Sequence, residues 1–496
     1  MKFLVLDFES YYADEYTLSK TTAEHYIRDP RFEIIGVSFA YLGEKPQWYS
    51  GDLDYIKSVL HQLPWHDIFV VGHNMSAFDS LILTEVVGVR PAAYGCTLQL
   101  ARCLNGSKTP DGKNISNSLG ALVRMYGLST EKGGEVIYAK NKRRQDFSPA
   151  DLTAYGNYCN NDVTLCAELW QKLSPQFPQS ELRLASLITK MWAEPRLLLD
   201  EPLLAAMGVE IAQRKAELLN KVADMMGVGS TMSHDERMFH TQKLLRSDAK
   251  FAELLQQYDV EIPMKLSPKK RDADGRAMQV YAFAKTDEGM AALLEYDEQD
   301  DETNEAVQAL AAARLGTKST IAESRVARFH GISTRGPLTV PLEYGKTLTH
   351  RLSGGGKINM QNMNQIKPVT KKTPNGALIM TPSGWSRLFK RAPDMSQIMD
   401  AQHRVWATQD CHVVGLRDVI MAPPGYKLVV ADSSNIELRT GHLFCGQMDT
   451  SAMLAAGEDL YCDSASKFYG RVITKADKKE RQHGKVAELQ LLYQAG

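Results

Sequence analysis

Five side chains in the first third of the sequence are of types that can hold divalent metal ions and orient a water molecule. Asp7 and Glu9 stand two residues apart in LVLDFES, where the period of a strand directs both to one face. Asp79 ends the stretch HNMSAFD, which follows the apolar run IFVVG. Tyr158 and Asp162 lie four residues apart in YCNND, so a helix would present both on one side.

Four carboxylates gathered from three elements repel one another unless cations lie between them. Two Mg²⁺ ions about 4 Å apart meet this need in enzymes that cleave phosphodiesters in line. The ions activate the attacking water and stabilise the phosphate in the transition state, and a tyrosine one turn from the last carboxylate can orient that water. Each acid alone is explained as well by a surface position or a helix cap. Asp259 and Glu261 in YDVE have the same spacing, and we interpret them as solvated surface.

The elements that must position these residues follow from apolar periodicity. Within residues 1–180, FLVLDF, IIGVSFAYL and IFVVGH predict strands, whereas SLGALVRMYGL and DLTAYGNYCNNDVTLCAELWQKL predict helices. This alternation favours an α/β domain on a mixed sheet. The pattern is helical from about 181 to 335, strands return from 336 to 445, and helical signals resume from 446. The acidic run EYDEQDDETNEA predicts a solvated face or a loop.

A second group of candidate residues begins at the end of YKLVVAD, the clearest strand signal after residue 336. Asp432 ends this run, and Glu437 and Arg439 follow on a helical pattern. A carboxylate at the end of a strand can hold a metal ion, or it can cap the helix that follows. Both interpretations remain open from these residues alone.

Residues 481–496, RQHGKVAELQLLYQAG, predict an amphipathic helix with one stripe at four-residue spacing, formed by Arg481, Lys485, Leu489 and Tyr493. Thr474–Asp477 predicts a capping box at its start. Cations in the first turns oppose the helix dipole, and a bound triphosphate would compensate them. The alternative is a surface helix with basic residues and an apolar inner stripe.

The first group of residues resembles the tyrosine subtype of the DEDD superfamily of 3′–5′ exonucleases. The shared pattern is DxE on the first strand, NxxxFD after a later strand and YxxxD on a helix. The resemblance implies a ribonuclease-H-like fold. It also implies that Asp7, Glu9, Asp79 and Asp162 bind two Mg²⁺ ions, with Mn²⁺ as a possible substitute, and that Tyr158 orients the water.

The later stretches resemble family A (polymerase I-like) DNA polymerases. DSSNIELR is similar to motif A of that family, which implies that Asp432 binds two further Mg²⁺ ions and that Glu437 excludes ribonucleotides. RQHGKVAELQLLYQAG is similar to motif B, the helix that closes over the incoming dNTP. The resemblance implies that Arg481 and Lys485 bind its phosphates and that Tyr493 lies beneath the templating base pair.

Two more stretches resemble DNA-contacting segments of the same family. THRLSGGGKINMQNMNQ is similar to the palm surface that faces the minor groove, and RLGTKST is similar to the thumb segment that contacts the duplex backbone. The implied DNA-binding residues are Lys318, Ser319, Thr320, Arg351, Asn359, Gln361 and Asn362. KLSPKKR adds a local basic cluster, which a solvated lysine face explains equally well.

These resemblances imply a multidomain α/β and α+β protein. A ribonuclease-H-like exonuclease domain (1–180) precedes a helical thumb (181–340), a partial palm (341–445) and partial fingers (446–496) of a right-hand polymerase. The family's third motif would follow residue 496. We therefore expect the N-terminal part of a phage-type replicative polymerase that binds primer–template DNA and dNTPs and is completed by a second polypeptide. A stand-alone exonuclease and an inactive remnant that binds primer–template are the alternatives.

The composition agrees with a cytoplasmic globular protein, in the host cytoplasm if the gene is a phage's. The net charge is −1, so any basic surface for DNA must be local. The seven cysteines form no CxxC pair, which favours a reducing compartment and gives no zinc site. The first residues lack the basic region and cleavage site of a signal peptide, and no apolar stretch is long enough to predict a membrane span.

Overall fold

The computed structural model describes residues 1–106, 109, 113–229, 232–318, 321–347, 350–363, 415–431 and 433–492, and it gives the backbone of five short strands between 378 and 413. The chain forms two compact units, Met1–Tyr426 and Lys427–Gly496. The fold of each unit is given separately below.

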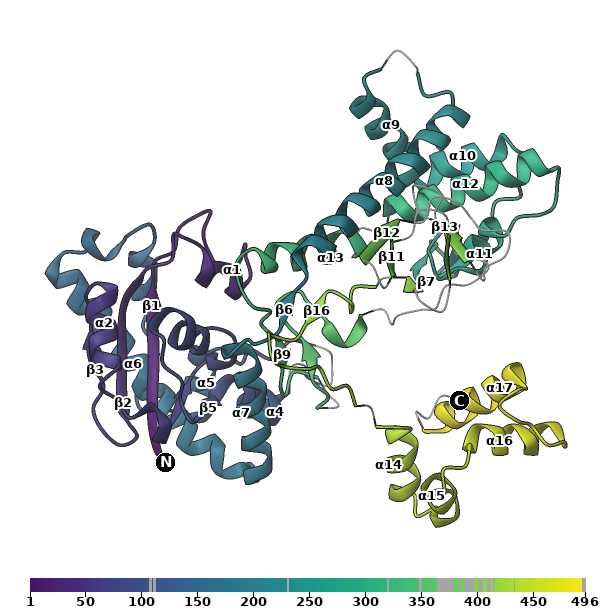
Figure 1. The fold of residues 1–496 in the computed structure, drawn as a ribbon. Coiled ribbons are helices and arrows are strands. Elements are labelled where there is room, and N and C mark those ends of the chain that lie inside the picture. Colours follow the sequence, from purple (N-terminus) through teal and green to yellow (C-terminus); the bar gives the residue numbers. More distant parts are fainter. Residues whose placement is uncertain are drawn as a thin grey trace. The chain divides into compact units, whose positions relative to one another are not determined.

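A mixed five-stranded sheet organises the first part of the first unit (Figure 1), with the strand order β3-β2-β1-β4-β5. The central strand β1 runs parallel to β4 and antiparallel to β2, while β4 is parallel to β5. The strands predicted in FLVLDF, IIGVSFAYL and IFVVGH are confirmed as β1, β2 and β4, as is the mixed sheet. The strands are β1 (Lys2–Ser10), β2 (Ile34–Tyr41), β3 (Gln47–Tyr49), β4 (Ile68–Gly72) and β5 (Ala93–Cys96).

Helices cover the sheet and separate the side chains of β1 into two hydrophobic layers. Leu4, Leu6 and Phe8 pack into a core with side chains of α1, α2 and α7, whereas Val5 packs into a core with α4, α5 and α6. Because successive strand residues point to opposite faces, Asp7 and Glu9 lie on the face of Val5, toward α6. The helices are α1 (Ala23–Arg28), α2 (Leu53–Leu60), α4 (Thr97–Asn105), α5 (Leu119–Tyr126), α6 (Pro149–Leu173) and α7 (Gln179–Ala193).

Helix α6 has clear local reasons to begin where it does. Pro149 occupies the first turn, where its missing N–H costs no hydrogen bond, and the Ser148 side chain accepts a hydrogen bond from the N–H of Asp151. The helix then runs for 25 residues along β1 and β2 (Figure 1). The helices predicted in SLGALVRMYGL and DLTAYGNYCNNDVTLCAELWQKL are therefore confirmed as α5 and α6.

Residues 201–333 are mainly helical, as predicted, and side chains between residues 219 and 313 share a hydrophobic core around α8 and α12. The acidic run is mostly exposed, and α12 begins within it. Asp259 and Glu261 are both exposed, as expected of solvated surface. The helices are α8 (Glu201–Met225), α9 (His234–Arg246), α10 (Asp248–Gln256), α11 (Glu288–Leu294), α12 (Asp301–Lys318) and α13 (Ile321–Ser333).

A β-hairpin interrupts this helical region, and the prediction of an all-helical segment is wrong there. Strand β7 (Met264–Arg271), which contains KLSPKKR, pairs antiparallel with β8 (Ala277–Tyr281). The physical reason lies in the turn, where the Asp272 carboxylate accepts the N–H of Arg276 at 2.8 Å. Gly275 adopts a φ of 79°, which glycine tolerates without strain.

A buried guanidinium joins three of these helices. Arg314 of α12 is fully buried and donates to the carbonyl of Leu245 at 2.6 Å. It also pairs with Asp248 at the start of α10, and its guanidinium lies over the rings of Phe251 and Phe283 at 4.4 and 4.8 Å. The cation therefore satisfies the last carbonyls of α9 while it packs against aromatic side chains.

The rest of the first unit consists of short strands. In the first two pairs β10 (Ser353–Gly354) joins β9 (Leu342–Glu343), and β16 (Ile420–Met421) joins β6 (Leu198–Leu199). Strand signals were predicted from residue 336 onward, and these pairs confirm them in part. Among the strands given by backbone alone, β11 pairs antiparallel with both β12 and β15, and β13 pairs antiparallel with β14. These strands are β11 (Leu378–Thr381), β12 (Gly384–Arg387), β13 (Gln397–Met399), β14 (Val405–Ala407) and β15 (His412–Val413).

The second unit is helical, as predicted from residue 446, but the strand predicted in YKLVVAD is wrong for residues 427–431, which form no strand. Val429 and Val430 are 91% and 92% exposed, so no described residue covers them. A strand needs a partner for its backbone groups as well as β-branched side chains. The helices are α14 (Ile436–Phe444), α15 (Met448–Ala455), α16 (Leu460–Tyr469) and α17 (Lys478–Leu492).

None of the helices in the described part of the chain is both long and apolar enough to cross a bilayer.

We expect Arg314→Ala to lower the free energy of unfolding of the helical region by about 2–4 kcal/mol, because it leaves buried carbonyls without a donor and opens a cavity. Urea unfolding followed by circular dichroism measures this change. Lys318→Ala is the matched control, since Lys318 pairs with the same Asp248 from an exposed position, and such pairs contribute less than about 1 kcal/mol. Equal losses in the two variants would contradict the structural role of Arg314.

Candidate metal centre

Three elements bring Asp7, Glu9, Asp79 and Asp162 into one cluster. Asp7 and Glu9 project from β1 toward α6, and Asp162 faces them from that helix. Asp79 begins the short helix α3 (Asp79–Leu81), and its Oδ1 accepts a hydrogen bond at 3.3 Å from the backbone N–H of Phe8. Phe8 stands between Asp7 and Glu9, so this bond ties the loop after β4 to the middle of the site. The structure therefore brings together the four carboxylates that the sequence singled out.

Helix α6 also holds the carboxylates of β1 in place. The Tyr155 hydroxyl donates a hydrogen bond to Glu9, and the Cys159 thiol donates to Asp7 Oδ2 at 3.5 Å. One ligand atom each from Asp7, Glu9 and Cys159 lies within 4.8 Å of the others. The rings of Tyr155 and Tyr158 stack with their centroids 6.0 Å apart, which restricts the rotation of both side chains.

Burial and mutual repulsion make the charged form of this cluster costly. The pKa of Asp7 is raised well above its usual range, first by burial and then by the charges of Asp79, Glu9 and Asp162. Burial raises the pKa of Glu9 to about 8 and that of Asp79 to about 7, although hydrogen bonds from Tyr155 and Phe8 oppose these shifts. The site is therefore built to receive positive charge.

Lys132 supplies a cation at the edge of this cluster. Its ammonium group donates to Tyr158 Oη at 2.8 Å, forms an ion pair with Asp162 and lies 4.7 Å from the centre of the Tyr158 ring. Its charge lowers the pKa values of Asp7 and Glu9 and only partly offsets the burial of both groups. One ammonium group does not compensate four clustered carboxylates.

The loop that carries Lys132 is pinned to α6. The backbone N–H of Ser129 donates to the Glu168 carboxylate at 2.9 Å, and the Thr130 hydroxyl donates to Asn161 Oδ1 at 2.6 Å. The Asn161 amide in turn donates to the carbonyl of Glu131 at 2.8 Å. The same helix thus places Asp162, Tyr158 and, through this loop, Lys132.

The donor set fits a divalent cation that prefers oxygen ligands. Mg²⁺ is bound through carboxylates and keeps several waters, which suits a site with four acids from three elements. The Cys159 thiol donates a hydrogen bond to Asp7 and, because burial raises its pKa, is held in the protonated form. Asp7, Glu9, Asp79 and Asp162 are accordingly the residues that can hold the metal.

In the second unit, Arg481 has a carboxylate partner within the protein. Its guanidinium donates to Asp459 Oδ2 at 2.9 Å and lies over the ring of Tyr461 at 5.2 Å. The sequence suggested that a bound triphosphate would compensate the charge of Arg481 in the first turns of the helix. Asp459 already compensates this charge within the protein. Lys485 is partly exposed one turn further along α17, and Glu437 lies in the first turn of α14. Asp432 and Tyr493 lie outside the described residues.

Close packing of α16 and α17 depends on one glycine. A Cβ atom at Gly484 would lie 2.2 Å from the carbonyl oxygen of Tyr461 and 3.0 Å from the backbone nitrogen of Ala465. The Glu488 carboxylate, one turn further along, accepts from the Ser464 hydroxyl and lies 3.3 Å from His442 Nε2. The predicted capping box is present in part, because Asp477 accepts from the N–H of Thr474 before α17 begins.

The remaining predicted DNA-binding residues do not form one described cluster. Lys318 donates to Asp248 at 2.7 Å, and Arg351 is exposed. The Asn359 side chain accepts from the N–H of Gln361 at 3.1 Å and so caps a short 3₁₀ turn. Ser319 and Thr320 lie outside the described residues, as does the side chain of Asn362.

Sequence reasoning missed Tyr155, Cys159 and Lys132. Tyr155 and Cys159 lie seven and three residues before Asp162, so helical periodicity alone places them on the same side of α6. Lys132 has no such signal, because the segment STEKGG that contains it has no periodic pattern. Contacts with α6 hold this segment at the site.

No protein-family model matches this sequence, and no curated protein matches it. Among solved structures, the chain is similar to the POL domain of Pol1 from M. smegmatis, a structure in complex with DNA primer-template and dNTP. The TM-score is 0.55 and the identity 14%, over 98% of this chain and 67% of that one. This likeness shows that the fold is that of a DNA polymerase domain.

We expect Mg²⁺ to raise the melting temperature of the metal-free protein, because it relieves the repulsion among the carboxylates. At a concentration 100 times the Kd, one bound ion adds about 2.7 kcal/mol of stability. Differential scanning fluorimetry after EDTA treatment measures the rise.

Two asparagine variants test where the ion binds. Asp7→Asn should raise the melting temperature of the metal-free protein and abolish its response to Mg²⁺, whereas the exposed Asp259→Asn should leave both unchanged. A full Mg²⁺ response in Asp7→Asn would show that the ion binds elsewhere.

Proposed function

We propose that this chain is a metal-dependent 3′–5′ exonuclease joined to the body of a family A, phage-type DNA polymerase, and that it acts on primer–template DNA. The observation that carries this proposal is the cluster of four carboxylates from β1, α3 and α6, with raised pKa values for Asp7, Glu9 and Asp79 and a tyrosine beside them. A ribonuclease-H-like domain of the DEDD type places the same residue types on the same elements.

Asp7, Glu9, Asp79 and Asp162 would hold two Mg²⁺ ions. When bound, such ions lower the pKa of the attacking water and stabilise charge on the phosphate and on the leaving 3′ oxygen. The protein's part is to hold its carboxylates in place before the metal arrives. The hydrogen bonds from Tyr155 to Glu9 and from Phe8 to Asp79 do this at two of the four ligands.

Tyr158 would orient the water rather than take its proton. Its pKa is raised far above the usual value, first by burial and then by Asp162, so the hydroxyl stays protonated at neutral pH. A protonated hydroxyl donates one hydrogen bond and accepts others, which is enough to direct a lone pair of the water at phosphorus. The stack on Tyr155 holds the ring in place for this purpose.

Lys132 would contact the scissile phosphate. In the described structure its ammonium group touches Tyr158 and Asp162, the two groups beside which that phosphate would lie. With the carboxylates neutralised by bound cations, the Lys132 ammonium would be free to donate to a phosphate oxygen, where negative charge develops.

The second unit would serve nucleotide binding. The likeness to a polymerase domain solved with primer-template and dNTP supports this role for Lys485, Glu437 and Arg481. Arg481 would reach a triphosphate by sharing or leaving its ion pair with Asp459. A stand-alone exonuclease and an inactive remnant that binds primer–template are the competing functions.

A gel assay tests the exonuclease. A 5′-labelled primer with a mismatched 3′ end, annealed to a longer template, should be shortened by the chain in Mg²⁺ and remain intact in EDTA. We expect Asp7→Asn to lose at least about a hundredfold in rate and Tyr158→Phe to lose about ten- to a hundredfold, while Asp259→Asn retains full activity.

The same assay with dNTPs separates the functions. Lengthening of a matched primer would support the polymerase role, and shortening alone would support an exonuclease that acts by itself. A wild-type chain that binds primer–template but leaves the mismatched primer intact in Mg²⁺ would exclude the exonuclease and leave the remnant.

We expect Lys132→Ala to slow single-turnover cleavage by about ten- to a hundredfold at saturating Mg²⁺, because it removes one donor to the developing charge. Lys132→Arg should retain most of the rate. Lys172→Ala, an exposed lysine near the other end of α6, is the matched control. An unchanged rate in Lys132→Ala would limit this lysine to pairing with Asp162 in the metal-free protein.

A further inference from the structure

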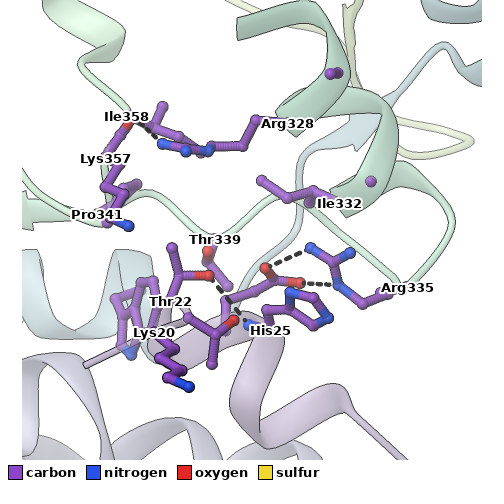
Figure 2. A pocket seen from close by; sticks show the side chains of 16 residues that line it. Lys20, Thr22, His25, Arg328, Ile332, Arg335, Thr339, Pro341, Lys357 and Ile358 are labelled. Atoms are coloured by element: carbon purple, nitrogen blue, oxygen red, sulfur yellow. Dashed lines mark hydrogen bonds and ion pairs between the residues drawn. The ribbon is translucent and has the colours of Figure 1, made fainter. Parts of the chain in front are cut away.

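A cavity of about 280 Å³ lies between α1, α13 and the segment around β9 and β10, all within the first unit (Figure 2). It is separate from the carboxylate cluster, since none of the four acids lines it. Trp192, Ile332 and Pro341 form an apolar wall, and Thr22 and Thr339 add hydroxyl groups. The cavity therefore offers both apolar contact and hydrogen bonds.

The charges that line the cavity are mostly positive. Lys20, Arg328, Arg335 and Lys357 are the full cations, and Glu24 is the carboxylate. The Glu24 carboxylate is already engaged, because Arg335 donates to both of its oxygens, at 3.0 and 2.9 Å (Figure 2), and Arg28 lies 3.2 Å away. The positive charge is therefore local, in a chain whose net charge is −1.

Two of these cations have no acidic partner among the described residues. Arg328 Nη1 donates to the backbone carbonyl of Lys357 at 2.5 Å (Figure 2), which holds the guanidinium at the cavity wall and leaves its other N–H groups available. Lys357 is exposed and has a φ of 58°, an uncommon conformation for a residue other than glycine. Packing within the protein explains Arg335, which pairs with Glu24, but it does not explain the charges of Arg328 and Lys357.

A second cavity of about 260 Å³ shares Thr22, Trp192 and Lys357 with the first. It extends to Asn74 and Ser76, in the loop that leads from β4 to Asp79. The two cavities thus adjoin, and the second ends beside the loop that places one carboxylate of the metal centre.

We propose that the cavity between α1 and α13 binds a phosphate group of single-stranded DNA. A guanidinium fork beside an ammonium group matches the geometry and charge of a phosphate, and the apolar wall suits the sugar or base attached to it. The strand would continue through the second cavity toward the loop before Asp79. A free nucleotide carries the same phosphate and is the other source of this ligand.

The test measures binding in EDTA on the Asp7→Asn background, so that no cleavage occurs and the result does not depend on whether the chain is an exonuclease. Fluorescence anisotropy of a labelled ten-residue oligo-dT gives the Kd at several salt concentrations. The double variant Arg328→Gln/Lys357→Gln removes the two cations that have no acidic partner in the described part of the chain. The matched control is Lys45→Gln/Lys172→Gln, two exposed cations that line neither cavity.

We expect the cavity variant to weaken binding about tenfold at low salt. The slope of log K against log salt should fall by about 0.7, since the contact with one phosphate of a single strand contributes about 0.7. The control should change neither quantity. Equal losses in both variants, or no loss in the cavity variant, would overturn the proposal.

Two further measurements keep the result interpretable. Arg328→Lys preserves the positive charge and should retain most of the affinity. This variant separates loss of charge from loss of the contact with the Lys357 carbonyl. Its melting temperature reports whether the loop that carries Lys357 is intact. Competition with dTMP distinguishes the two sources of the phosphate. Displacement of the oligonucleotide by dTMP only in the millimolar range supports a strand site, whereas displacement at micromolar dTMP would overturn it in favour of a nucleotide pocket.

Discussion

Repulsion among four clustered carboxylates, three of them buried, is the constraint on which the first unit depends. Asp7 and Glu9 lie on one face of β1 because strand residues alternate, and the burial that makes the sheet stable raises the pKa of both. Asp79 and Asp162 add charge from two other elements, and Lys132 returns only one positive charge. The cluster therefore costs stability locally, which is the arrangement expected of a functional site.

Helix α6 converts this constraint into a defined geometry. One side of it supplies Asp162, the stacked rings of Tyr155 and Tyr158, and the thiol that contacts Asp7. Its outer polar residues, Asn161 and Glu168, hold the loop that ends at Lys132. A single rigid element therefore positions most of the groups, and small movements of the loop would leave the carboxylates in place.

Elsewhere in the described structure, some cations have acidic partners and others do not. Arg314 and Arg481 pair with Asp248 and Asp459, so both positive charges have an acidic partner within the protein, and Arg314 joins helices. Arg328 and Lys357 at the cavity have no such acidic partners among the described residues. The difference separates cations that belong to packing from cations available to a ligand, and net charge alone does not reveal it.

The sequence by itself determined the strand that carries Asp7 and Glu9 and the helix that carries Tyr158 and Asp162, because these follow from local periodicity. It misjudged the β7–β8 hairpin and the strand in YKLVVAD, since a turn within a helical pattern and the lack of a pairing strand are not signals of composition. Only the tertiary structure decided that Lys132 joins the carboxylates, that Arg481 has Asp459 as a partner and that Arg328 meets Lys357 at a cavity. Such contacts join residues far apart in the chain or on different elements, and no local pattern encodes them.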